Sequence, residues 1–346
     1  MGKPVFFNNE NELENFLSIP HDVTVEVVKN LDGDFMILGI GGKMGPTLGK
    51  MIINAAKKAG VSKNAYGVSR FSDTNIRTGL EKSGIECFTC DLLNPEEVLN
   101  LPTVKNVIFM AGRKFGQAGS DHLTWALNTI VPANVARYFT DSRIVVFSTG
   151  SVYDLCPVDS NGPSETDTFT SVGEYANSCL GRERIFEHYS RQNGTKTLLF
   201  RLNYAIDLRY GVLYEIGEKV FKCSPINLDM GYANVIWQGD ACNYAIRSLE
   251  LAASPPEILN VTGSKIRVRD VAYLFGDLMG KKPVFFGDEA STALLSDNSK
   301  MCRIFGEPPT SLVQMINWIT DWIMKGGKIL DKPTHFQTRN GQFLDE

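Results

Sequence analysis

The sequence predicts an α/β protein built on a doubly wound parallel sheet, with a smaller C-terminal lobe. From Asp34 onward, short apolar runs of strand length alternate with amphipathic segments of helical length. A glycine-rich turn joins the first of these strands to the first helix, and after residue 202 the alternation loosens. We therefore predict an N-terminal extension at 1–33, a nucleotide-binding sheet domain at 34–202, a substrate lobe at 203–330 with elements returning to the sheet, and a tail at 331–346.

The elements of the sheet domain follow in order. Strands are predicted at 35–40, 65–69, 85–90, 106–112, 143–149 and 196–202. Helices are predicted between them at 43–60, 73–84, 121–139 and 175–192. The first helix has Met44, Leu48 and Ile52 on one face and ends in glycine. Strands that alternate with helices at this spacing form a parallel sheet, which binds ligands at the C-terminal ends of its strands.

The remaining segments are less regular. In the extension at 1–33, the sequence predicts one short acidic helix followed by a connection. In the second lobe, a strand and a helix are predicted within 234–253, a strand at 257–263, and amphipathic helices at 268–280 and 310–327.

Composition excludes several classes of protein. The chain has 346 residues, 43% of them apolar, and its net charge of -4 gives no support for nucleic-acid binding. Seven scattered cysteines predict no disulfide framework, and the pair Cys87 and Cys90 has no partner cluster that would complete a metal site. No signal-peptide core or membrane-spanning run is present, so we expect a cytoplasmic protein without metal or membrane partners.

The turn after the first strand carries the strongest single motif. Gly39, Gly42 and Gly45 stand in a GxxGxxG spacing, with Lys43 and Met44 between the last two. Such a turn lets the backbone approach a pyrophosphate closely and aims a helix N-terminus at it. The motif therefore predicts dinucleotide binding.

The end of the second strand bears on which dinucleotide binds. A carboxylate there would accept hydrogen bonds from a ribose 2′-hydroxyl, but this chain has Ser69 and Arg70. A guanidinium and a hydroxyl suit a 2′-phosphate, and Lys43 adds positive charge. We favour NADP over NAD, with Asp73 leaving NAD open.

With these motifs placed, residues 34–325 resemble the extended short-chain dehydrogenase/reductase family, the NAD-dependent epimerase/dehydratase group, whose fold is of the Rossmann type. The glycine loop and the order of the later motifs carry the resemblance. Those motifs are Asp91-Leu92, Ala111-Gly112, Asn128, FSTGSVYD at 147–154, Tyr175, LLFRLNYA at 198–205, and NVIWQGDA at 234–241 with Asp240.

The resemblance implies an activity and a set of site residues. A hydride would pass between a sugar carbon and nicotinamide, Tyr175 would transfer the hydroxyl proton, and Thr149 would orient the same oxygen. It also implies a small sugar-type substrate and a homodimer formed through the helices at 121–139 and 175–192. The implied cofactor-binding residues are Gly39, Gly42, Lys43, Met44, Gly45, Ser69, Arg70, Asp91, Leu92, Ala111, Gly112, Arg113, Tyr175 and Asn203.

One departure from the family concerns the proton-transfer residue. A phenol with a pKa near roughly 10 needs a nearby cation to act as a base, and the family supplies a lysine four residues later on the same helix face. Here that position is Cys179. Three alternatives stay open: Arg113 or Lys114 substitutes, the protein binds cofactor without turnover, or Cys179 itself does chemistry. Arg182 shares the face but is expected to lie too far along the helix.

Two further departures concern the reaction and the substrate. Gly150 and Ser151 stand where 4,6-dehydratases carry an Asp-Glu pair, so epimerisation or simple oxidoreduction is favoured over elimination. Ala233 stands where relatives acting on nucleotide sugars often have an arginine. A free sugar, a sugar acid or a sugar phosphate therefore remains open, with four cations as possible anion holders: Arg209, Lys219, Lys222 and Arg267.

Overall fold

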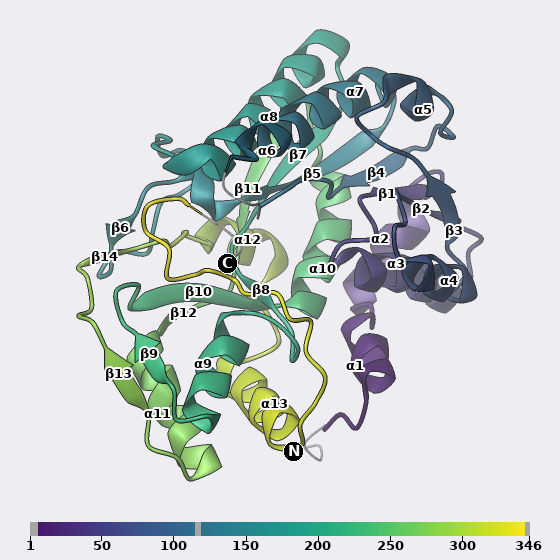
Figure 1. The fold of residues 1–346 in the computed structure, drawn as a ribbon. Helices are drawn as coiled ribbons and strands as arrows, with labels where there is room; N and C mark the ends of the chain where they lie inside the picture. The colour runs from purple at the N-terminus through teal and green to yellow at the C-terminus, as the bar shows by residue number, and fades with distance from the viewer. Residues whose placement is uncertain (1–5, 115–118, 343–346) are drawn as a thin grey trace.

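A seven-stranded parallel sheet forms the centre of the N-terminal half in the computed structural model, which describes residues 6–114 and 119–342 (Figure 1). The strand order is β11-β7-β5-β4-β1-β2-β3, and every neighbouring pair is parallel. The bounds are β1 Phe35–Leu38, β2 Ala65–Ser69, β3 Glu86–Thr89, β4 Asn106–Phe109, β5 Arg143–Thr149, β7 Thr197–Leu202 and β11 Glu257–Val261. The predicted doubly wound α/β class is confirmed, and β11 is the element that returns to the sheet.

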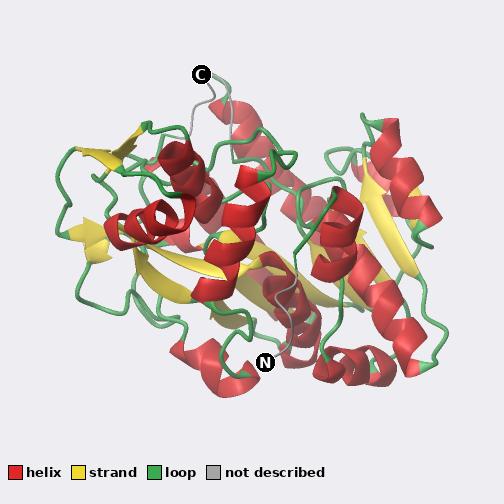
Figure 2. Ribbon diagram, turned by 90° about the horizontal axis from the view of Figure 1, so that it is seen from below, coloured by secondary structure: helices red, strands yellow, loops and turns green. Residues whose placement is uncertain are grey.

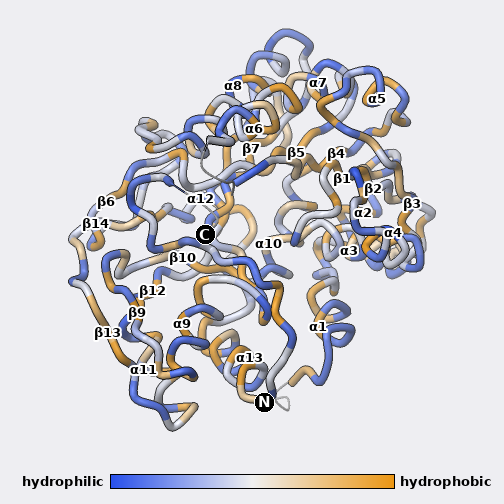
Figure 3. The backbone as a smooth tube through the Cα atoms, viewed as in Figure 1, coloured by the Kyte–Doolittle hydropathy of each residue, from blue (hydrophilic) through white to orange (hydrophobic). Residues whose placement is uncertain are grey.

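Helices cover both faces of this sheet (Figure 2). One face packs against α2 Asp22–Asn30, α3 Gly45–Ala59 and α10 Gln238–Arg247, and the other against α7 Val131–Tyr138 and α8 Gly173–Asn193. The central strands are largely apolar because both of their faces are buried (Figure 3). The shorter helices α4 Thr74–Lys82 and α5 Pro95–Leu99 follow β2 and β3.

The helix predicted at 121–139 contains a π-helical turn. It consists of α6 Asp121–Trp125, the π segment Ala126–Ile130, and α7. A π turn accommodates an extra residue and is often found at functional sites. Here it carries the buried side chain of Asn128, which contacts the loop after β4.

A second core lies in the C-terminal lobe. Its three-stranded sheet has the order β12-β10-β8, with β8 Ala205–Ile206, β10 Tyr232–Trp237 and β12 Ser264–Arg267. The helices α9 Val212–Phe221, α11 Val268–Met279 and α13 Leu312–Met324 pack together beside it. Smaller elements complete the lobe: β9 Pro225–Asn227 with β13 Val284–Phe286, β6 Cys156–Pro157 with β14 Thr292–Ala293, and α12 Ser299–Phe305.

The N-terminal extension has two helices rather than the one predicted. Leu13 and Leu17 of α1 Glu10–Leu17 are buried in the core of the C-terminal lobe. Helix α2 packs against α3 and α10 of the sheet domain. The extension therefore contacts both halves of the chain.

The segment after α13 returns across the C-terminal lobe toward the ends of the sheet strands (Figure 1). Leu330 donates its backbone hydrogen to the carbonyl of Arg209. Phe336 is buried in the lobe's core, and Arg339 donates to the carbonyls of Asp229 and Thr292. Residues 325–342 are thus packed onto the lobe, and we call them the C-terminal segment.

Three properties of the described residues bear on function. None of their helices is long and apolar enough to span a membrane. No group of three or more His, Cys, Asp or Glu side chains among them could hold a metal ion. All seven cysteines are unpaired.

Candidate active site

Two adjoining cavities lie at the C-terminal ends of the central strands, and they share Gly39, Gly42 and Met110. We call them the Tyr175 cavity, of about 270 Å³, and the Arg70 cavity, of about 290 Å³. Residues of both halves of the chain line the Tyr175 cavity, whereas only the sheet domain lines the Arg70 cavity. The glycine loop therefore borders both of them.

The glycine loop fits a dinucleotide. Gly39 has a φ of +92°, and a Cβ on it would lie 2.7 Å from the backbone nitrogen of Ala111. A Cβ on Gly45 would lie 2.2 Å from the carbonyl oxygen of Ile40. Gly42 differs, because a Cβ there would meet only the Gly39 carbonyl oxygen, at 3.4 Å. Its backbone borders both cavities just before the N-terminus of α3, where a pyrophosphate would be favoured.

The Arg70 cavity brings together most of the cofactor residues predicted beyond the loop. These are Ser69, Arg70, Asp91, Leu92, Ala111 and Gly112. Sequence reasoning missed Ser72, Leu127 and Val131, which also line it. Asp73 does not line it, because its carboxylate accepts a hydrogen bond from the backbone of Asn75 and caps α4.

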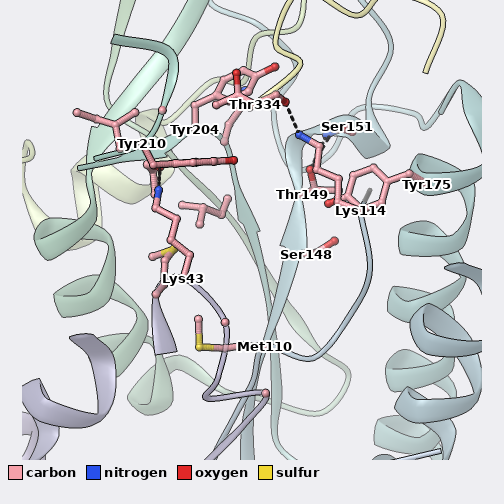
Figure 4. Close-up of a pocket in the computed structure, with 18 residues that line it drawn as sticks. Lys43, Met110, Lys114, Ser148, Thr149, Ser151, Tyr175, Tyr204, Tyr210 and Thr334 are labelled. Carbon is pink, nitrogen blue, oxygen red and sulfur yellow. Dashed lines mark hydrogen bonds between the residues drawn. The ribbon is translucent and has the colours of Figure 1, made fainter. Parts of the chain in front are cut away.

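The side chain of Lys43 points away from Arg70, beside which the sequence had suggested that its charge would help to bind a 2′-phosphate. Its Nζ donates to the carbonyl of Ala205 at 2.9 Å and lies 3.7 Å from the ring centroid of Tyr210. The side chain therefore lines the Tyr175 cavity and not the Arg70 cavity (Figure 4). Burial lowers the pKa of Lys43 to about 8.

Thr149 and Tyr175 line the same cavity from different elements. Thr149 ends β5, and its hydroxyl accepts a hydrogen bond from the Ser151 backbone at 3.1 Å. Tyr175 lies in the first turn of α8. Burial raises the pKa of Tyr175 well above its ordinary range, and Cys179 raises it further. The charge of Arg182 and a hydrogen bond with Thr149 lower that pKa.

Cys179 occupies a fully buried position one helical turn after Tyr175. Its Sγ lies 4.0 Å from Nδ2 of Asn128. Burial raises the pKa of the Cys179 thiol, which keeps it protonated. A buried, neutral thiol is a poor nucleophile, so the environment does not favour chemistry at Cys179.

The two substitute cations proposed from the sequence differ in placement. Lys114 lines the Tyr175 cavity, where its Nζ donates to the carbonyl of Thr334 at 3.1 Å and lies 6.0 Å from the Tyr175 ring centroid. Burial lowers the pKa of Lys114 to about 8. Arg113 does not line that cavity, and its guanidinium donates to Ser120. The Asn128 side chain binds both the N–H and the carbonyl of Arg113, which fixes the loop carrying Lys114.

The charge of Arg182 acts on Tyr175, although its position in the sequence suggested that it would not. Its guanidinium donates to the carbonyl of Phe147 at 2.8 Å and to the Asn128 side chain at 2.5 Å. A Cβ on Gly112 would lie 2.2 Å from it, so glycine makes room there. We had expected Arg182 to lie too far along α8, yet its charge lowers the pKa of Tyr175.

A buried polar network supports the end of β5 beneath the cavity. Glu183 accepts hydrogen bonds from Ser148 at 2.5 Å and from Arg201 at 2.7 Å. Arg201 also donates to the hydroxyl of Tyr153, which donates to Asn260. The sequence did not decide whether Tyr153 lines the cleft or packs in the core. Its hydroxyl belongs to this buried network.

Several lining residues were not among the predicted catalytic or cofactor-binding residues. Tyr204 follows directly after Asn203, which also lines the cavity, so the motif at 198–205 offered a signal for it. Thr334 comes from the predicted tail and carried no signal. The others are Met110, Ser148, Ser151, Leu202, Ala205, Ile206, Tyr210 and Gly211.

The four cations considered as anion holders do not line either of the two cavities. Arg209 is bound to Asp207 and Glu14. Lys222 pairs with Glu218, and Arg267 pairs with Glu289.

Comparison with known proteins agrees with this geometry. Residues 36–205 match the model of the NAD dependent epimerase/dehydratase family. The match spans just under half of the chain, and the segment that it covers is similar to a domain of this family. The segment runs from the first strand through the glycine loop, Thr149 and Tyr175 to the start of the C-terminal lobe, and the family description names NAD as the cofactor. No curated relative matches the chain by sequence.

Solved structures share the fold of this chain at low sequence identity. Pal from Bacillus thuringiensis has a TM-score of 0.69 at 17% identity, covering 84% of this chain and 99% of that one. UDP-glucose 4-epimerase from Thermotoga maritima has a TM-score of 0.67 at 16% identity, covering 85% and 99%. UDP-glucuronic acid 4-epimerase from Bacillus cereus, solved with UDP-glucuronic acid and NAD, has a TM-score of 0.69 at 14% identity, covering 84% and 99%.

Proposed function

We propose that this protein is an NAD(P)-dependent epimerase or oxidoreductase of sugars or sugar derivatives. One observation carries the proposal: Tyr175 and Thr149 border the same cavity as the backbone of the glycine loop. A proton-transfer group and a hydroxyl that can orient the substrate oxygen therefore stand beside the expected end of a dinucleotide.

The cofactor would span both cavities. Its adenosine half would lie against Asp91, Leu92 and Ala111, its pyrophosphate at the N-terminus of α3, and its nicotinamide toward Asn203. The exposed Arg70, with Ser69 beside it, favours the 2′-phosphate of NADP. Asp73 caps α4 and does not line the Arg70 cavity, which also supports NADP.

When bound, nicotinamide supplies or accepts the hydride. Thr149 hydrogen-bonds the substrate oxygen and holds it near Tyr175, whose hydroxyl gives or takes the proton of that oxygen. The buried phenol needs positive charge nearby to ionise. Lys114, on the loop after β4, and Arg182, beneath the cavity, supply it in place of the lysine that Cys179 replaces.

Epimerisation or oxidoreduction fits the site better than elimination of water. The two positions after Thr149 are Gly150 and Ser151, and the Ser151 hydroxyl accepts a hydrogen bond from Thr149 at 3.2 Å. Neither residue can serve as a carboxylic acid or carboxylate base.

We also propose that the protein acts as a homodimer in the cytoplasm, in carbohydrate metabolism. Large apolar side chains are exposed along the helices at 121–139: Leu123 is 42% exposed and Ile130 50%. A pair of such faces would bury this surface between two copies. Light scattering on the purified protein measures the oligomeric state.

Turnover of candidate sugars with NADP or NAD tests the proposal. Nicotinamide absorbance follows oxidoreduction, and chromatography of the sugars follows epimerisation. Tyr175→Phe should lower kcat by about 10²–10⁴-fold while leaving cofactor affinity nearly unchanged. If Tyr175→Phe matches the wild type, the mechanism is wrong. If the wild type binds cofactor but turns over no sugar, the competing interpretation of a catalytically silent NAD(P)-binding protein is favoured.

A further inference from the structure

Two tyrosines of the C-terminal lobe, Tyr204 and Tyr210, line the Tyr175 cavity opposite the predicted catalytic residues. In Figure 4 these tyrosines lie on one side of the space, and Thr149 and Tyr175 lie on the other. The Tyr210 side chain points across the cavity toward the side of Thr149 (Figure 4). Proton transfer at Tyr175 uses neither of these two phenols, so their place in the wall calls for another role.

We propose that Tyr210 is a specificity-determining residue whose hydroxyl hydrogen-bonds a sugar hydroxyl remote from the reacting carbon, and that Lys43 of the glycine loop holds the Tyr210 ring in place. Tyr210 thus touches the substrate, whereas Lys43 acts through Tyr210 as a positioning residue. The proposal deepens the proposed function and rests on it, since it names what the same site recognises in its substrate.

The Tyr210 hydroxyl is available to a ligand, because it makes no hydrogen bond to another of the described residues. Burial, with the charges of Glu215 and Asp207, raises the pKa of Tyr210 well above its ordinary range, so the hydroxyl stays protonated. A neutral hydroxyl both donates and accepts, as a sugar hydroxyl does. When a sugar displaces water from the cavity, an unpaired phenol hydroxyl costs free energy, which favours substrates that supply a partner for it.

Lys43 fixes the Tyr210 ring from the glycine loop. Its Nζ lies 3.7 Å from the ring centroid and donates to the Ala205 carbonyl at 2.9 Å. The carbonyl anchors the ammonium, and the ammonium attracts the face of the ring through a cation–π interaction. The Tyr210 carbonyl accepts a hydrogen bond from the Asp207 backbone at 3.1 Å, which holds the main chain as well. A side chain of the cofactor loop therefore sets the orientation of a side chain of the substrate lobe.

The opposed placement of Tyr175 and Tyr210 determines which part of the sugar each of them meets. The reacting carbon must bring its oxygen to Thr149 and Tyr175. The carbons on the far side of the sugar ring then face the other wall of the cavity, where Tyr210 lies. Sugars differ in the presence and orientation of the hydroxyls at these carbons, so one hydrogen bond there distinguishes substrates. Such a contact is made equally before and during the reaction, and its loss raises KM with little change in kcat.

Binding calorimetry on the full-length protein with NADP tests the role of Tyr210 independently of turnover. The probes are D-glucose, D-galactose, D-glucuronate and UDP-glucose, followed by the monodeoxy analogues of the sugar that binds most tightly. Tyr210→Phe should raise the Kd of that sugar about threefold to tenfold. One deoxy analogue should bind the wild type more weakly than its parent by a similar factor. In Tyr210→Phe that analogue and its parent should bind alike, because the partner of the missing hydroxyl is already gone.

Tyr214→Phe is the matched control, because the Tyr214 hydroxyl donates to Glu218 and Tyr214 lines neither cavity. It should leave the Kd of every probe unchanged. If Tyr210→Phe discriminates between the sugar and each deoxy analogue as the wild type does, Tyr210 makes no such contact and the inference is wrong. Failure of all the probes to bind the wild type would also overturn it.

Variants of Lys43 test its positioning role. Lys43→Met should raise the Kd of the same sugar, and adding it to Tyr210→Phe should raise that Kd no further. Lys43→Arg should restore much of the affinity, since a guanidinium also stacks on an aromatic face. Additive effects of Lys43→Met and Tyr210→Phe, or weaker NADP binding with sugar discrimination intact, would exclude this role for Lys43.

Turnover separates the inference from the proposed function. Tyr210→Phe should raise KM and leave kcat within a few-fold of wild type. If the wild type binds a sugar through Tyr210 but turns over none, the proposed reaction fails while the assignment of Tyr210 stands. If the wild type turns over a sugar and Tyr210→Phe matches it in both kcat and KM, the reaction stands and the assignment of Tyr210 fails.

Discussion

The Nζ atom of Lys114 lies 6.0 Å from the ring centroid of Tyr175, although the two residues come from different elements. Tyr175 lies in the first turn of α8, and Lys114 lies in the loop after β4. The usual family arrangement places both groups on one helix, whereas here a loop carries the cation. Asn128 holds the backbone of the preceding residue, Arg113, on both its N–H and its carbonyl, so the π turn of the neighbouring helix indirectly positions Lys114.

The pH dependence of kcat/KM should show a loss at high pH. Burial lowers the pKa of Lys114 and of Lys43 to about 8, so both ammonium groups are charged below that pH and neutral above it. Among the described residues, the titratable and charged groups that act on them include Glu215 and Cys179 for Lys114, and Asp207, Arg209, Glu215 and Cys242 for Lys43. We expect kcat/KM to fall as the pH rises through about 8.

The Lys114→Met variant separates the two lysines. It should lower kcat and remove the loss of kcat/KM as the pH rises through about 8, because the ammonium group beside Tyr175 that titrates there is gone. Lys43→Met should leave that loss in place, because Lys43 lies beside Tyr210 and not beside Tyr175. A pH profile that does not change in Lys114→Met would show that Lys114 does not assist Tyr175.

Removal of the thiol tests whether Cys179 takes part in chemistry. Cys179→Ala should keep kcat within a few-fold of wild type and cost about 1 kcal/mol of stability from the lost packing. Burial and a raised thiol pKa also predict slow alkylation of Cys179 in the folded protein. Exposed Cys223 is the internal control, since it should react readily. Loss of turnover in both Cys179→Ala and Cys179→Ser would assign the thiol a chemical role.

Cofactor choice should depend on Arg70. Arg70→Ala should weaken NADP by about 1.5–3 kcal/mol, the value of hydrogen bonds to a charged group, and affect NAD little. Fluorescence titration of both dinucleotides measures this difference. Equal weakening of NADP and NAD would mean that Arg70 contacts the adenine and not a 2′-phosphate.

The buried pair of Glu183 and Arg201 should dominate local stability. Both side chains are fully buried, and their closest nitrogen–oxygen distance is 2.7 Å. Arg201→Met would leave Glu183 charged and without this partner, at a cost of about 3–5 kcal/mol in the free energy of unfolding. Arg191→Met, which breaks an exposed pair on the same helix as Glu183, should cost no more than about 1 kcal/mol. Denaturant unfolding of the two variants compares these values.

The sequence predicted the sheet because its strands are buried on both faces and read as unbroken apolar runs. That the glycine loop, Thr149 and Tyr175 border one cavity could be expected from the sequence, because parallel strands end at the same edge of a sheet. The position of Lys43 did not follow, since its neighbours in the sequence belong to the cofactor loop while its side chain crosses to Ala205 and Tyr210. Residue spacing alone predicted that Arg182 would be too far from Tyr175 to affect it. A long side chain on a helix extends back toward the helix N-terminus, which shortens that distance.

The least predictable part of the site is the wall formed by Thr334. Its placement depends on contacts between segments far apart in the sequence, such as Thr334 with Glu215 and Arg339 with Thr292. No periodicity or motif marks such a segment. For the same reason, the sequence could not show that the N-terminal extension is packed against the rest of the protein. The leucines of its first helix, α1, are buried in the core of the C-terminal lobe.

The position of Thr334 links occupancy of the site to protease sensitivity at the end of the chain. If docking of the C-terminal segment strengthens ligand binding in the cavity, then ligand binding must stabilise the docked segment. The two effects are equal in free energy. Substrate should therefore slow cleavage within residues 325–342, and a nick there should weaken substrate. Limited proteolysis then becomes a direct gauge of which sugars enter the cavity, with no need for turnover.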